Sequence, residues 1–569
     1  MALIDKASLL MVPSTYEAGT LYNVLPSGNR APDSTDQNSG YDQTRADFTF
    51  DRGTDHGATR IGSDGLIKKY RENLITQSNN FSDSDWITSN TSVTSGQVDK
   101  DGGTSAWLLE KGATSYSSIY QPVTISGVYT FSVYAKAGTA SIMTLRDGIN
   151  QRALFDLSDG SIDSTAGSPV DAEIELISTG WYRCSITMTT SNPNLQIYVG
   201  WSDSTAGNIY IQNAQLEASM VATDYLDSGA TTAKAGVLID LPRINYDANG
   251  ENGSLLLEPQ RTNLLPHSEY FGVWGKVSAT ITANTTISPD GYQNANTFTT
   301  SGSGARIFQT LSLGAGTYTA SLYVKKLSGS GNMRFFGIVD GGGVTQSFTP
   351  TDEWQRFTGN FTASTGITEI QLRENGFTGT LAIYGFQLEA GSYPTSYIPN
   401  HGESGGVTRA ADFGSDDDIT ASPIEFGAND DFTLFYEGSF NDLSSTSNMI
   451  MGGGRQQLGS SYKNYWWVQN ATNMRITGEG EVKLATTTMS LSDNTNHKLL
   501  VKRNGSIVDF FVDGVKLTTT QNNPNTAFTF RSLGWAYTNS VYKVSGNLKK
   551  AIIFNEALTD AECITLTTL

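Results

Sequence analysis

A long segment of this chain occurs twice, and this repeat limits the fold more than any other feature. The first copy begins at Asn73-Leu74 and ends at Gln215-Leu216-Glu217, and the second begins at Asn263-Leu264 and ends at Gln387-Leu388-Glu389. Both copies contain a Tyr-Thr-x-Ser-x-Tyr-x-Lys run and a later Trp-x-Arg triplet at similar spacing. A period of about 190 residues is that of a duplicated domain and far exceeds a solenoid unit.

Alternation within the repeat predicts β-strands. In the run from Tyr129 to Lys136, apolar residues occupy every second position, as in a strand with one buried face. The chain is rich in glycine, with 58 of its 569 residues, and only 16% of its residues are charged. Many short strands separated by turn residues are typical of antiparallel sandwiches. We therefore expect an all-β chain with two antiparallel jelly-roll β-sandwiches in tandem.

The ends of the chain differ from the repeat. Residues 1–45 are irregular apart from one short apolar run, and we expect an N-terminal attachment arm there. From residue 413 onward, Asn504-Gly505 and Asp513-Gly514 predict hairpins, and Thr559 with Glu562 predicts a helix-capping box. The expected domains are 1–45, 46–228, 229–412 and 413–569, where each module includes the hairpin that leads into it.

Composition excludes several classes of function. The net charge of −19 opposes binding to phosphate backbones and to anionic membrane surfaces, so we expect no nucleic-acid partner and no membrane insertion. No signal peptide and no apolar run of about 18 residues are evident. The cysteines, Cys184 and Cys563, fall in different expected domains, which predicts buried free thiols and excludes a disulfide framework or a cysteine-based zinc site.

No motif in the sequence supports catalysis. The histidines are isolated in loops, and Glu479 and Glu481 lack the spacing of a glycanase carboxylate pair on one strand. Glycine-rich runs lack the Lys-Ser/Thr of a phosphate-binding loop. We therefore expect a protein that is not an enzyme and has no cofactor. The Asp-rich loop at Asp416–Asp418 matches no calcium motif, and a structural calcium ion stays an open alternative.

Aromatic side chains are the candidates for ligand binding, because flat rings stack on sugar rings. Trp466 and Trp467 are adjacent and must point to opposite faces of a strand, so at least one is expected off the core face. Trp107 and Trp201 have no counterpart in the second copy, unlike Trp86 and Trp274. The alternative for every candidate is a role in packing. The candidate carbohydrate-binding residues are Tyr465, Trp466, Trp467, Arg475, Trp535, Tyr537, Trp107 and Trp201.

The repeat resembles the carbohydrate-binding-module-like jelly rolls of phage virion proteins. The motifs that carry the resemblance are Ala58-Thr59-Arg60, Arg261-Thr262-Asn263-Leu264-Leu265, Gln387-Leu388-Glu389, Tyr393-Pro-Thr-Ser-Tyr-Ile-Pro399 and Val407-Thr408-Arg409-Ala410-Ala411-Asp412. The segment 413–569 resembles a concanavalin A-like lectin or laminin-G-like sandwich, through its strand, its Asp-Gly hairpin, its last strand and the Leu558-Thr-Asp-Ala-Glu562 run that follows.

These resemblances imply a non-enzymatic tail fibre or head fibre on the exterior of a tailed phage. The expected protein is a trimer on the virion surface, with an N-terminal arm that binds other virion proteins and a C-terminal domain that binds host-surface glycans. The Tyr-Pro-Thr-Ser-Tyr-Ile-Pro segment is interpreted as a join between the repeat and the lectin-like domain. The alternatives are a capsid decoration protein without a receptor and a depolymerase of surface polysaccharide.

Overall fold

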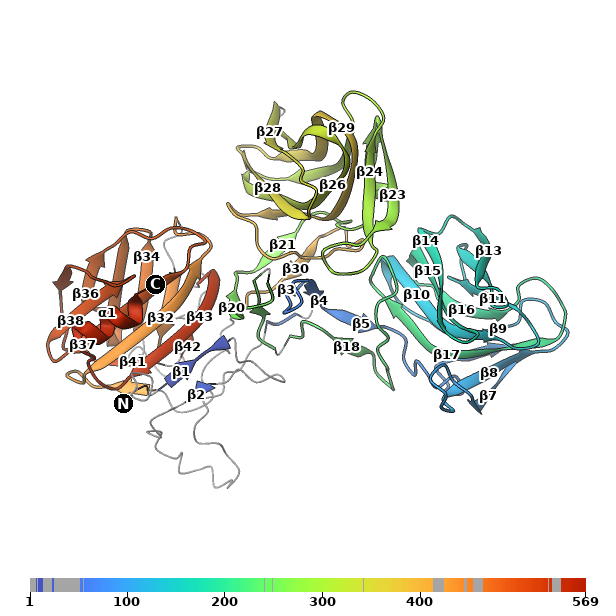
Figure 1. Cartoon of the computed structure of the whole chain (residues 1–569), viewed down its shortest axis with the longest axis horizontal. Coiled ribbons are helices and arrows are strands. Elements are labelled where there is room, and N and C mark those ends of the chain that lie inside the picture. Colours follow the sequence, from blue (N-terminus) through green and yellow to red (C-terminus); the bar gives the residue numbers. More distant parts are fainter. Residues whose placement is uncertain are drawn as a thin grey trace, which may run out of the picture. The chain divides into compact units, whose positions relative to one another are not determined.

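The structure is a computed structural model of the whole chain (Figure 1). It describes residues 7, 9–13, 23–24, 52–54, 56–239, 241–247, 249–340, 342–412, 424–444, 448–453, 464–530, 532–534 and 544–568. Contacts divide the chain into two compact units. The first contains Met1–Lys68, Val237–Arg261 and Thr408–Leu569, and the second contains Lys69–Gly236 and Thr262–Val407. The second unit therefore holds both copies of the repeat.

The first copy is an antiparallel sandwich of two sheets. In spatial order, one sheet contains β14 (Asp171–Ser178), β15 (Trp181–Ser191), β10 (Ser126–Ala137), β17 (Gly207–Glu217), β8 (Ala106–Lys111) and β7 (Thr91–Gln97). The other contains β13 (Ser161–Ala166), β12 (Arg152–Asp156), β11 (Ile142–Arg146), β16 (Asn194–Val199), β9 (Ser118–Pro122) and β6 (Ile87–Ser89). A short pair, β5 (Arg71–Asn73) and β18 (Ala233–Ala235), joins the ends of the copy.

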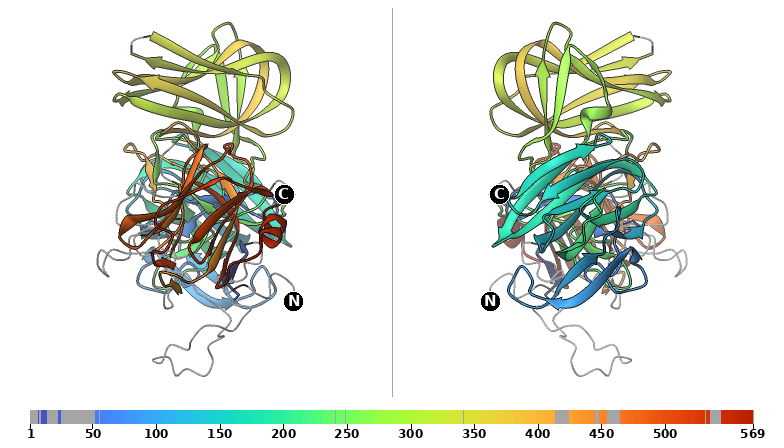
Figure 2. Two further views of the ribbon diagram at one scale, coloured as in Figure 1. Left: turned by 90° about the vertical axis from the view of Figure 1, so that its left-hand side faces the viewer. Right: turned by 90° about the vertical axis from the view of Figure 1, so that its right-hand side faces the viewer.

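The second copy keeps the order of the strands that it shares with the first, but it lacks counterparts of the edge strands β13 and β14, and two of its strands are continuous where the first copy is broken. Strand β26 pairs with β28 through its first half and with β27 through its second half. At the middle of β26, Gly329 has a φ of 91°, and a Cβ there would lie 2.0 Å from the carbonyl oxygen of Thr378. Glycine at this position thus permits β26 to bend at its middle, where its pairing partner changes (Figure 2). The strands are β22 (Gly275–Val277), β23 (Ala279–Thr286), β24 (Ala295–Thr300), β25 (Arg306–Leu313), β26 (Gly316–Val339), β27 (Gly342–Phe348), β28 (Gln355–Ala363) and β29 (Ile367–Ala390).

The alternation expected from the sequence places the core of each copy. On β10, Phe131, Val133 and Ala135 are buried between the sheets, and Tyr134 packs on the other side of its sheet with Trp181. Cys184 is a buried free thiol, as predicted. Trp86 and Trp274 occupy equivalent places, and the indole N–H of each donates to a backbone carbonyl. The prediction of tandem antiparallel sandwiches is confirmed.

A buried carboxylate closes the second copy. Glu389 on the last strand accepts hydrogen bonds from the backbone N–H and the hydroxyl of Thr395, at 2.8 and 2.7 Å, and from the amide of Gln387 at 2.7 Å. The Gln387 carbonyl accepts from the N–H of Ile398, and Asn263 at the start of the copy donates to the carbonyl of Ile398. The Tyr-Pro-Thr-Ser-Tyr-Ile-Pro segment therefore ties the end of the module to its beginning.

The first copy closes with the same atoms. Glu217 accepts from the N–H of Thr223 at 2.8 Å, from the Thr223 hydroxyl, and from the amide of Gln215 at 2.7 Å. Gln215 accepts from the N–H of Leu226, and Asn73 donates to the carbonyl of Leu226. We call this arrangement the carboxylate clasp. It explains why Asn-Leu and Gln-Leu-Glu recur at the ends of both copies.

A buried ionic cluster lies beside the second clasp. The Lys69 ammonium contacts Asp290 at 2.7 Å and Glu269 at 3.2 Å, and the hydroxyls of Tyr384 and Tyr397 donate to Glu269 at 3.0 Å. Burial opposes the charge on Asp290, but Lys69 and further hydrogen bonds outweigh it and lower the pKa of Asp290 to about 2. The two buried carboxylates are thus both partnered.

The C-terminal segment is a second kind of sandwich. One sheet contains β43 (Gly546–Phe554), β32 (Phe432–Phe440), β37 (His497–Asn504), β38 (Ile507–Val512) and β39 (Val515–Lys516). The facing sheet contains β40 (Thr519–Gln521), β36 (Val482–Thr488), β35 (Asn473–Gly478), β34 (Tyr465–Asn470), β33 (Asn448–Gly452) and β42 (Ser532–Leu533). The helix α1 (Asp560–Thr567) begins with the predicted capping box of Thr559 and Glu562.

Two segments from elsewhere in the chain extend the β43 edge of this sandwich. Strand β1 (Leu9–Met11) pairs with residues 551–553 of β43, and β20 (Ser254–Leu257) pairs with residues 546–548. The first of these strands is formed by the short apolar run noted in residues 1–45 of the sequence. The four domain ranges expected from the sequence stay a prediction. These pairings show in addition that residues 9–11 and 254–257 pack with the C-terminal sandwich.

A second buried ionic cluster connects the three chain segments that make up the first unit. Arg243 contacts Asp412 and Glu258 through its guanidinium, and it donates to the carbonyl of Thr59 at 2.8 Å. Arg409 contacts the same Glu258 carboxylate. The Val-Thr-Arg-Ala-Ala-Asp motif noted in the sequence therefore has a structural role here.

The clasp generates a stability prediction. Replacing Glu389 with alanine leaves three buried donors without an acceptor, and each such donor costs about 1–3 kcal/mol. We expect Glu389→Ala to lower the stability of the second module by about 3–5 kcal/mol, measured as a shifted transition in differential scanning calorimetry. The control is Glu353→Ala, which removes a carboxylate that is 92% exposed. Equal transition temperatures for the two variants would contradict a stabilising role for the clasp.

Candidate functional site

The outer face of one sheet in the first module carries an aromatic and basic cluster. On β11, β16 and β9, residues 145, 197 and 119 point into the core, so the residues next to them point outward. Arg146, Gln196 and Tyr120 form one row across these strands, because the three are paired directly opposite one another. Trp201 follows the end of β16 and is half-buried.

Trp201 is the centre of this cluster. Its ring lies 4.7 Å from the guanidinium carbon of Arg152 and 5.6 Å from that of Arg146, within the range of a cation–π contact. The rings of Tyr116 and Tyr198 meet it edge-on, with centroids 5.1 and 5.0 Å away. Tyr116 is 54% exposed, so the cluster is open to solvent.

The backbone at Trp201 is held from two sides. The N–H of Tyr116 donates to the carbonyl of Trp201 at 3.1 Å. Two residues farther on, Asp203 accepts from the buried Lys111 ammonium at 2.8 Å. The hydrogen bond and the charge of Lys111 hold the pKa of Asp203 below its ordinary value, so this ion pair persists at neutral pH. The tryptophan is therefore presented in a defined orientation.

This face contains the group types that sugar recognition uses. Arg146 donates to the Gln196 carbonyl at 2.8 Å, and the Tyr198 hydroxyl donates to the same oxygen at 2.9 Å. Aromatic rings stack on the apolar face of a pyranose, while amides and guanidinium groups bind hydroxyls. Sequence reasoning selected Trp201 but missed the residues around it. The outward positions of the predicted strands, adjacent to core positions, could have indicated Arg146 and Gln196.

The second module has an equivalent face. Gln371 of β29 occupies the place of Gln196, because each is the glutamine at the centre of the row that crosses the sheet. The neighbours differ, with Phe308 and Phe336 beside Gln371. Nearby, a hollow of about 550 Å³ is lined by residues that include Glu374. Neither Gln371 nor these phenylalanines were candidates in the sequence, since a phenylalanine in a strand is usually a core residue.

Trp107 lies in a different setting from Trp201. It is half-buried against the core of the first module, with its ring edge-on to Phe81 at 6.3 Å. Its indole N–H donates to the carbonyl of Asn79 at 2.8 Å. The structure therefore does not bring Trp107 and Trp201 into one cluster, and a binding role for Trp107 stays a prediction.

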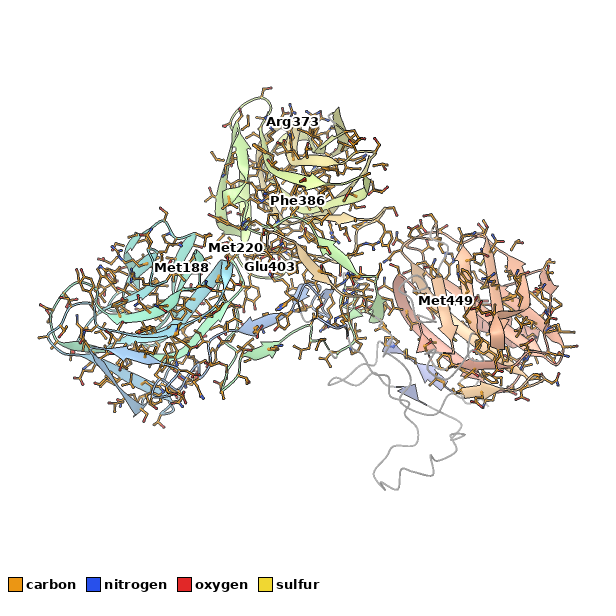
Figure 3. The ribbon with its side chains drawn as sticks, turned by 180° about the vertical axis from the view of Figure 1, so that it is seen from behind. Met188, Met220, Arg373, Phe386, Glu403 and Met449 are labelled. Carbon is orange, nitrogen blue, oxygen red and sulfur yellow. The ribbon has the colours of Figure 1, made fainter. Side chains whose placement is uncertain are left out.

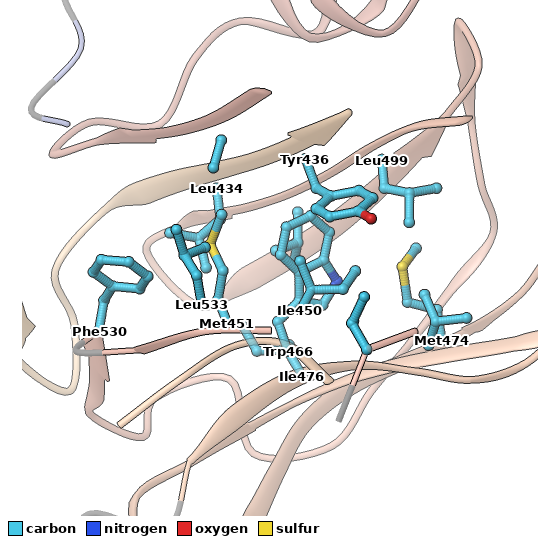
Figure 4. Packing of buried hydrophobic residues seen from close by; sticks show 14 of the residues in the cluster. Leu434, Tyr436, Ile450, Met451, Trp466, Met474, Ile476, Leu499, Phe530 and Leu533 are labelled. Atoms are coloured by element: carbon cyan, nitrogen blue, oxygen red, sulfur yellow. The ribbon is translucent and has the colours of Figure 1, made fainter. Parts of the chain in front are cut away.

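In the C-terminal sandwich, the adjacent tryptophans point to opposite faces, as predicted. Trp466 is fully buried among Ile450, Met451 and Ile476 (Figure 4), so it has no exposed surface with which to reach a glycan. Trp467 lies on the outer face with Tyr465, and the Arg475 guanidinium carbon is 4.0 Å from its ring. Trp467 is only 7% exposed, and Trp535 and Tyr537 lie outside the described residues.

In the part of the chain that the structure describes, the acidic pair noted in the sequence is not placed like a glycanase carboxylate pair. Glu479 and Glu481 lie in the short 3-10 turn Glu479–Glu481 rather than side by side on a strand. Within the described ranges, no group of three or more histidine, cysteine or acidic side chains is placed to hold a metal ion. A helix long and apolar enough to cross a membrane is likewise not found among these residues.

Comparison with known proteins agrees with this architecture at its C-terminal end. Residues 413–563 match the concanavalin A-like lectin/glucanases superfamily. The chain is therefore all-β, with jelly-roll-type sandwiches followed by a concanavalin A-like domain. A search of curated proteins found no significant match.

Several solved carbohydrate-binding modules are similar to parts of the chain. The tandem CBM22-1-CBM22-2 domain of Paenibacillus barcinonensis Xyn10C matches 59% of this chain and 99% of its own length, with 11% identity and a TM-score of 0.21. The CBM40 of the Ruminococcus gnavus IT-sialidase, solved with α2,3 sialyllactose, matches 26% of this chain and 97% of its own, with 14% identity and a TM-score of 0.21. TM-scores of this size say nothing about the ligand of this chain.

The two tryptophans generate a prediction that separates core from surface. We expect Trp466→Ala to destabilise the C-terminal sandwich by about 3–5 kcal/mol, because it empties a large volume in the core. Trp467→Ala removes a ring that packs outside the core, and we expect less than half of this loss. Urea unfolding monitored by circular dichroism measures both, and a larger effect for Trp467→Ala would contradict the assignment.

Proposed function

We propose that this protein binds glycans on a cell surface without cleaving them. The observation that carries the proposal is the solvent-open cluster of Trp201 with Arg146 and Arg152 on the outer face of the first module. An indole ring edged by guanidinium groups offers a stacking surface together with hydrogen-bond donors. The concanavalin A-like domain at 413–563 supports the same class of ligand.

We further propose that the protein stands on the exterior of a tailed-phage virion, as a tail fibre or head fibre. The repeated module and its motifs resemble those of phage virion proteins, and this resemblance supports the location. Trimerisation and contact with other virion proteins through residues 1–45 belong to the same proposal. Several weak sites on one particle would gain strength from multivalency.

The glycan-binding part is tested with Trp201→Ala on an array of neutral and acidic oligosaccharides. Because the indole supplies the stacking surface, we expect affinity for the glycans bound by the first module to fall at least tenfold. Leu176→Ala is the control, since it removes an apolar side chain of the same module that is 63% exposed and lies outside the cluster. Thermal melting of both variants verifies folding. Unchanged binding by a folded Trp201→Ala protein would overturn this site.

The location is tested by immunogold labelling of purified virions from the phage that encodes the chain. Label on tails or heads is expected, and its position separates a tail fibre from a head fibre. Absence of label on intact particles would exclude a virion component. A depolymerase is separated from a binder by incubation with surface polysaccharide, where release of reducing ends at catalytic rates would contradict the non-enzymatic proposal.

A further inference from the structure

Three arginines form a row across the outer face of the second module. Arg306 of β25 is paired directly opposite Arg373 of β29, and Arg373 is paired directly opposite Arg334 of β26. Directly opposed residues lie about 5 Å apart and point to the same side of the sheet. Their sequence neighbours Ile307, Leu372 and Phe335 point into the core. Figure 3 labels Arg373 on this module, together with Phe386 of the core.

Two phenyl rings lie beside this row, against the backbone of neighbouring strands. The ring of Phe308 covers Gly275, and the ring of Phe336 covers Gly343, where an added Cβ would meet ring atoms at 2.2 and 2.4 Å. Glycine at these positions lets each ring rest on the backbone of the neighbouring strand. Arg373 lies 5.3 Å from the centre of the Phe336 ring. The face therefore combines flat apolar platforms with adjacent positive charge.

The positive charge of the row is not neutralised within the module. Among the described residues, the guanidinium groups of Arg334 and Arg373 have no hydrogen-bond or ion-pair partner, and the Nε atoms of all three arginines are buried without an acceptor. Like charges directly opposite one another on a sheet are destabilising. These arginines lack acidic partners although the chain has a net charge of −19 and therefore many acidic side chains that could pair with them.

Two carboxylates lie in the region of the arginine row, and each accepts hydrogen bonds from groups other than these arginines. Glu374 accepts from the backbone N–H groups of Gly376 and Gly304, and these bonds, aided by the arginine charges, hold its pKa below the ordinary value. Glu369 accepts from the Gln371 amide and lies about 13 Å along the strand from Arg373. A positive excess therefore remains on the row.

The first module lacks this row at the equivalent places. Counted from Gln196 and Gln371, the positions of Arg306, Arg373 and Arg334 correspond to Ser118, Tyr198 and Thr144, which carry only hydroxyl groups. The two copies of one fold thus differ at these three positions, and the arginine row belongs to the second module alone. The 550 Å³ hollow is lined by Glu374, the residue that follows Arg373 in the sequence, and has the size of a small-ligand site.

We infer that the second module binds an anionic glycan, in which a sugar ring stacks on Phe308 or Phe336 and a carboxylate or sulfate group is held by the arginine row. A guanidinium group binds such planar or tetrahedral oxyanions through paired N–H donors. The inference rests on the proposed glycan-binding function and names the ligand class of one of its sites. The first module offers Trp201 with Arg146 and Arg152 instead of this row, so the two modules present different groups to a ligand.

The test uses the full-length protein and titration calorimetry with three probes. Tetragalacturonate carries carboxylates, its methyl ester is the same chain without charge, and a carrageenan tetrasaccharide carries sulfates. We expect binding of at least one acidic probe, weakening with added salt, and at least tenfold weaker binding of the methyl ester. The response to the carboxylate and sulfate probes identifies which anion the row prefers.

The matched variants are Arg334→Gln/Arg373→Gln and Lys325→Gln/Lys326→Gln. Both remove two positive charges from β26 or its neighbour, but the lysines are paired with Glu353 and Asp352 at the surface and lie outside the row. We expect the arginine variant to lose acidic-probe affinity at least tenfold and the lysine variant to keep it, with thermal melting to verify folding.

Three outcomes would overturn the inference: no binding of either acidic probe at millimolar concentration, equal binding of the methyl ester, or equal effects of the two double variants. None of them touches the proposed glycan binding of the first module, which is read out separately by Trp201→Ala. Conversely, if no binding depends on Trp201 but the second module still binds the acidic probes, the proposed site of the first module fails and the inference about the second module stands.

Discussion

A buried glutamate carboxylate closes each jelly-roll module, and the arrangement of the repeat depends on it. Glu217 and Glu389 each accept three hydrogen bonds, two from the threonine of the segment that follows the last strand and one from a glutamine amide on that strand. A buried charge is tolerated only when such donors surround it. Since Asn73 and Asn263 bind the same returning segments, the clasp fixes the beginning and the end of each module at one place. The rest of the module can then vary without loss of closure.

The two modules differ most clearly in the residues on their outer faces. Gln196 and Gln371 hold the same place, but the first lies near Trp201 with Arg146 and tyrosines, and the second lies beside two phenyl rings and the arginine row. The cores beneath both faces remain apolar and closely packed. Changes on an outward face cost little packing energy, because these side chains do not fill the space between the sheets. A duplicated module therefore allows one chain to carry two different outer faces on the same fold.

Local pattern predicted most of the strands and turns, since alternation, turn residues and capping boxes are read from neighbours in sequence. The capping box at Thr559 and the opposite orientation of Trp466 and Trp467 followed directly. The pattern did not indicate which tryptophan is in the core, because both faces of that strand are covered by apolar or aromatic side chains. The arginine row was missed for a different reason. Its members lie on three strands far apart in sequence, and each alone has the pattern of a solvent-exposed residue.

The pairing of β1 with β43 has a consequence for the order of folding during synthesis. Ala551–Ile553 is synthesised about 540 residues after its partner Leu9–Met11. At about 5–20 residues per second, the first strand waits roughly 30–110 s for its partner. The second unit, which is made entirely between these two strands, is complete well before then. The exposed apolar residues of β1 need protection during that interval, whereas both jelly-roll modules are able to fold as soon as they emerge.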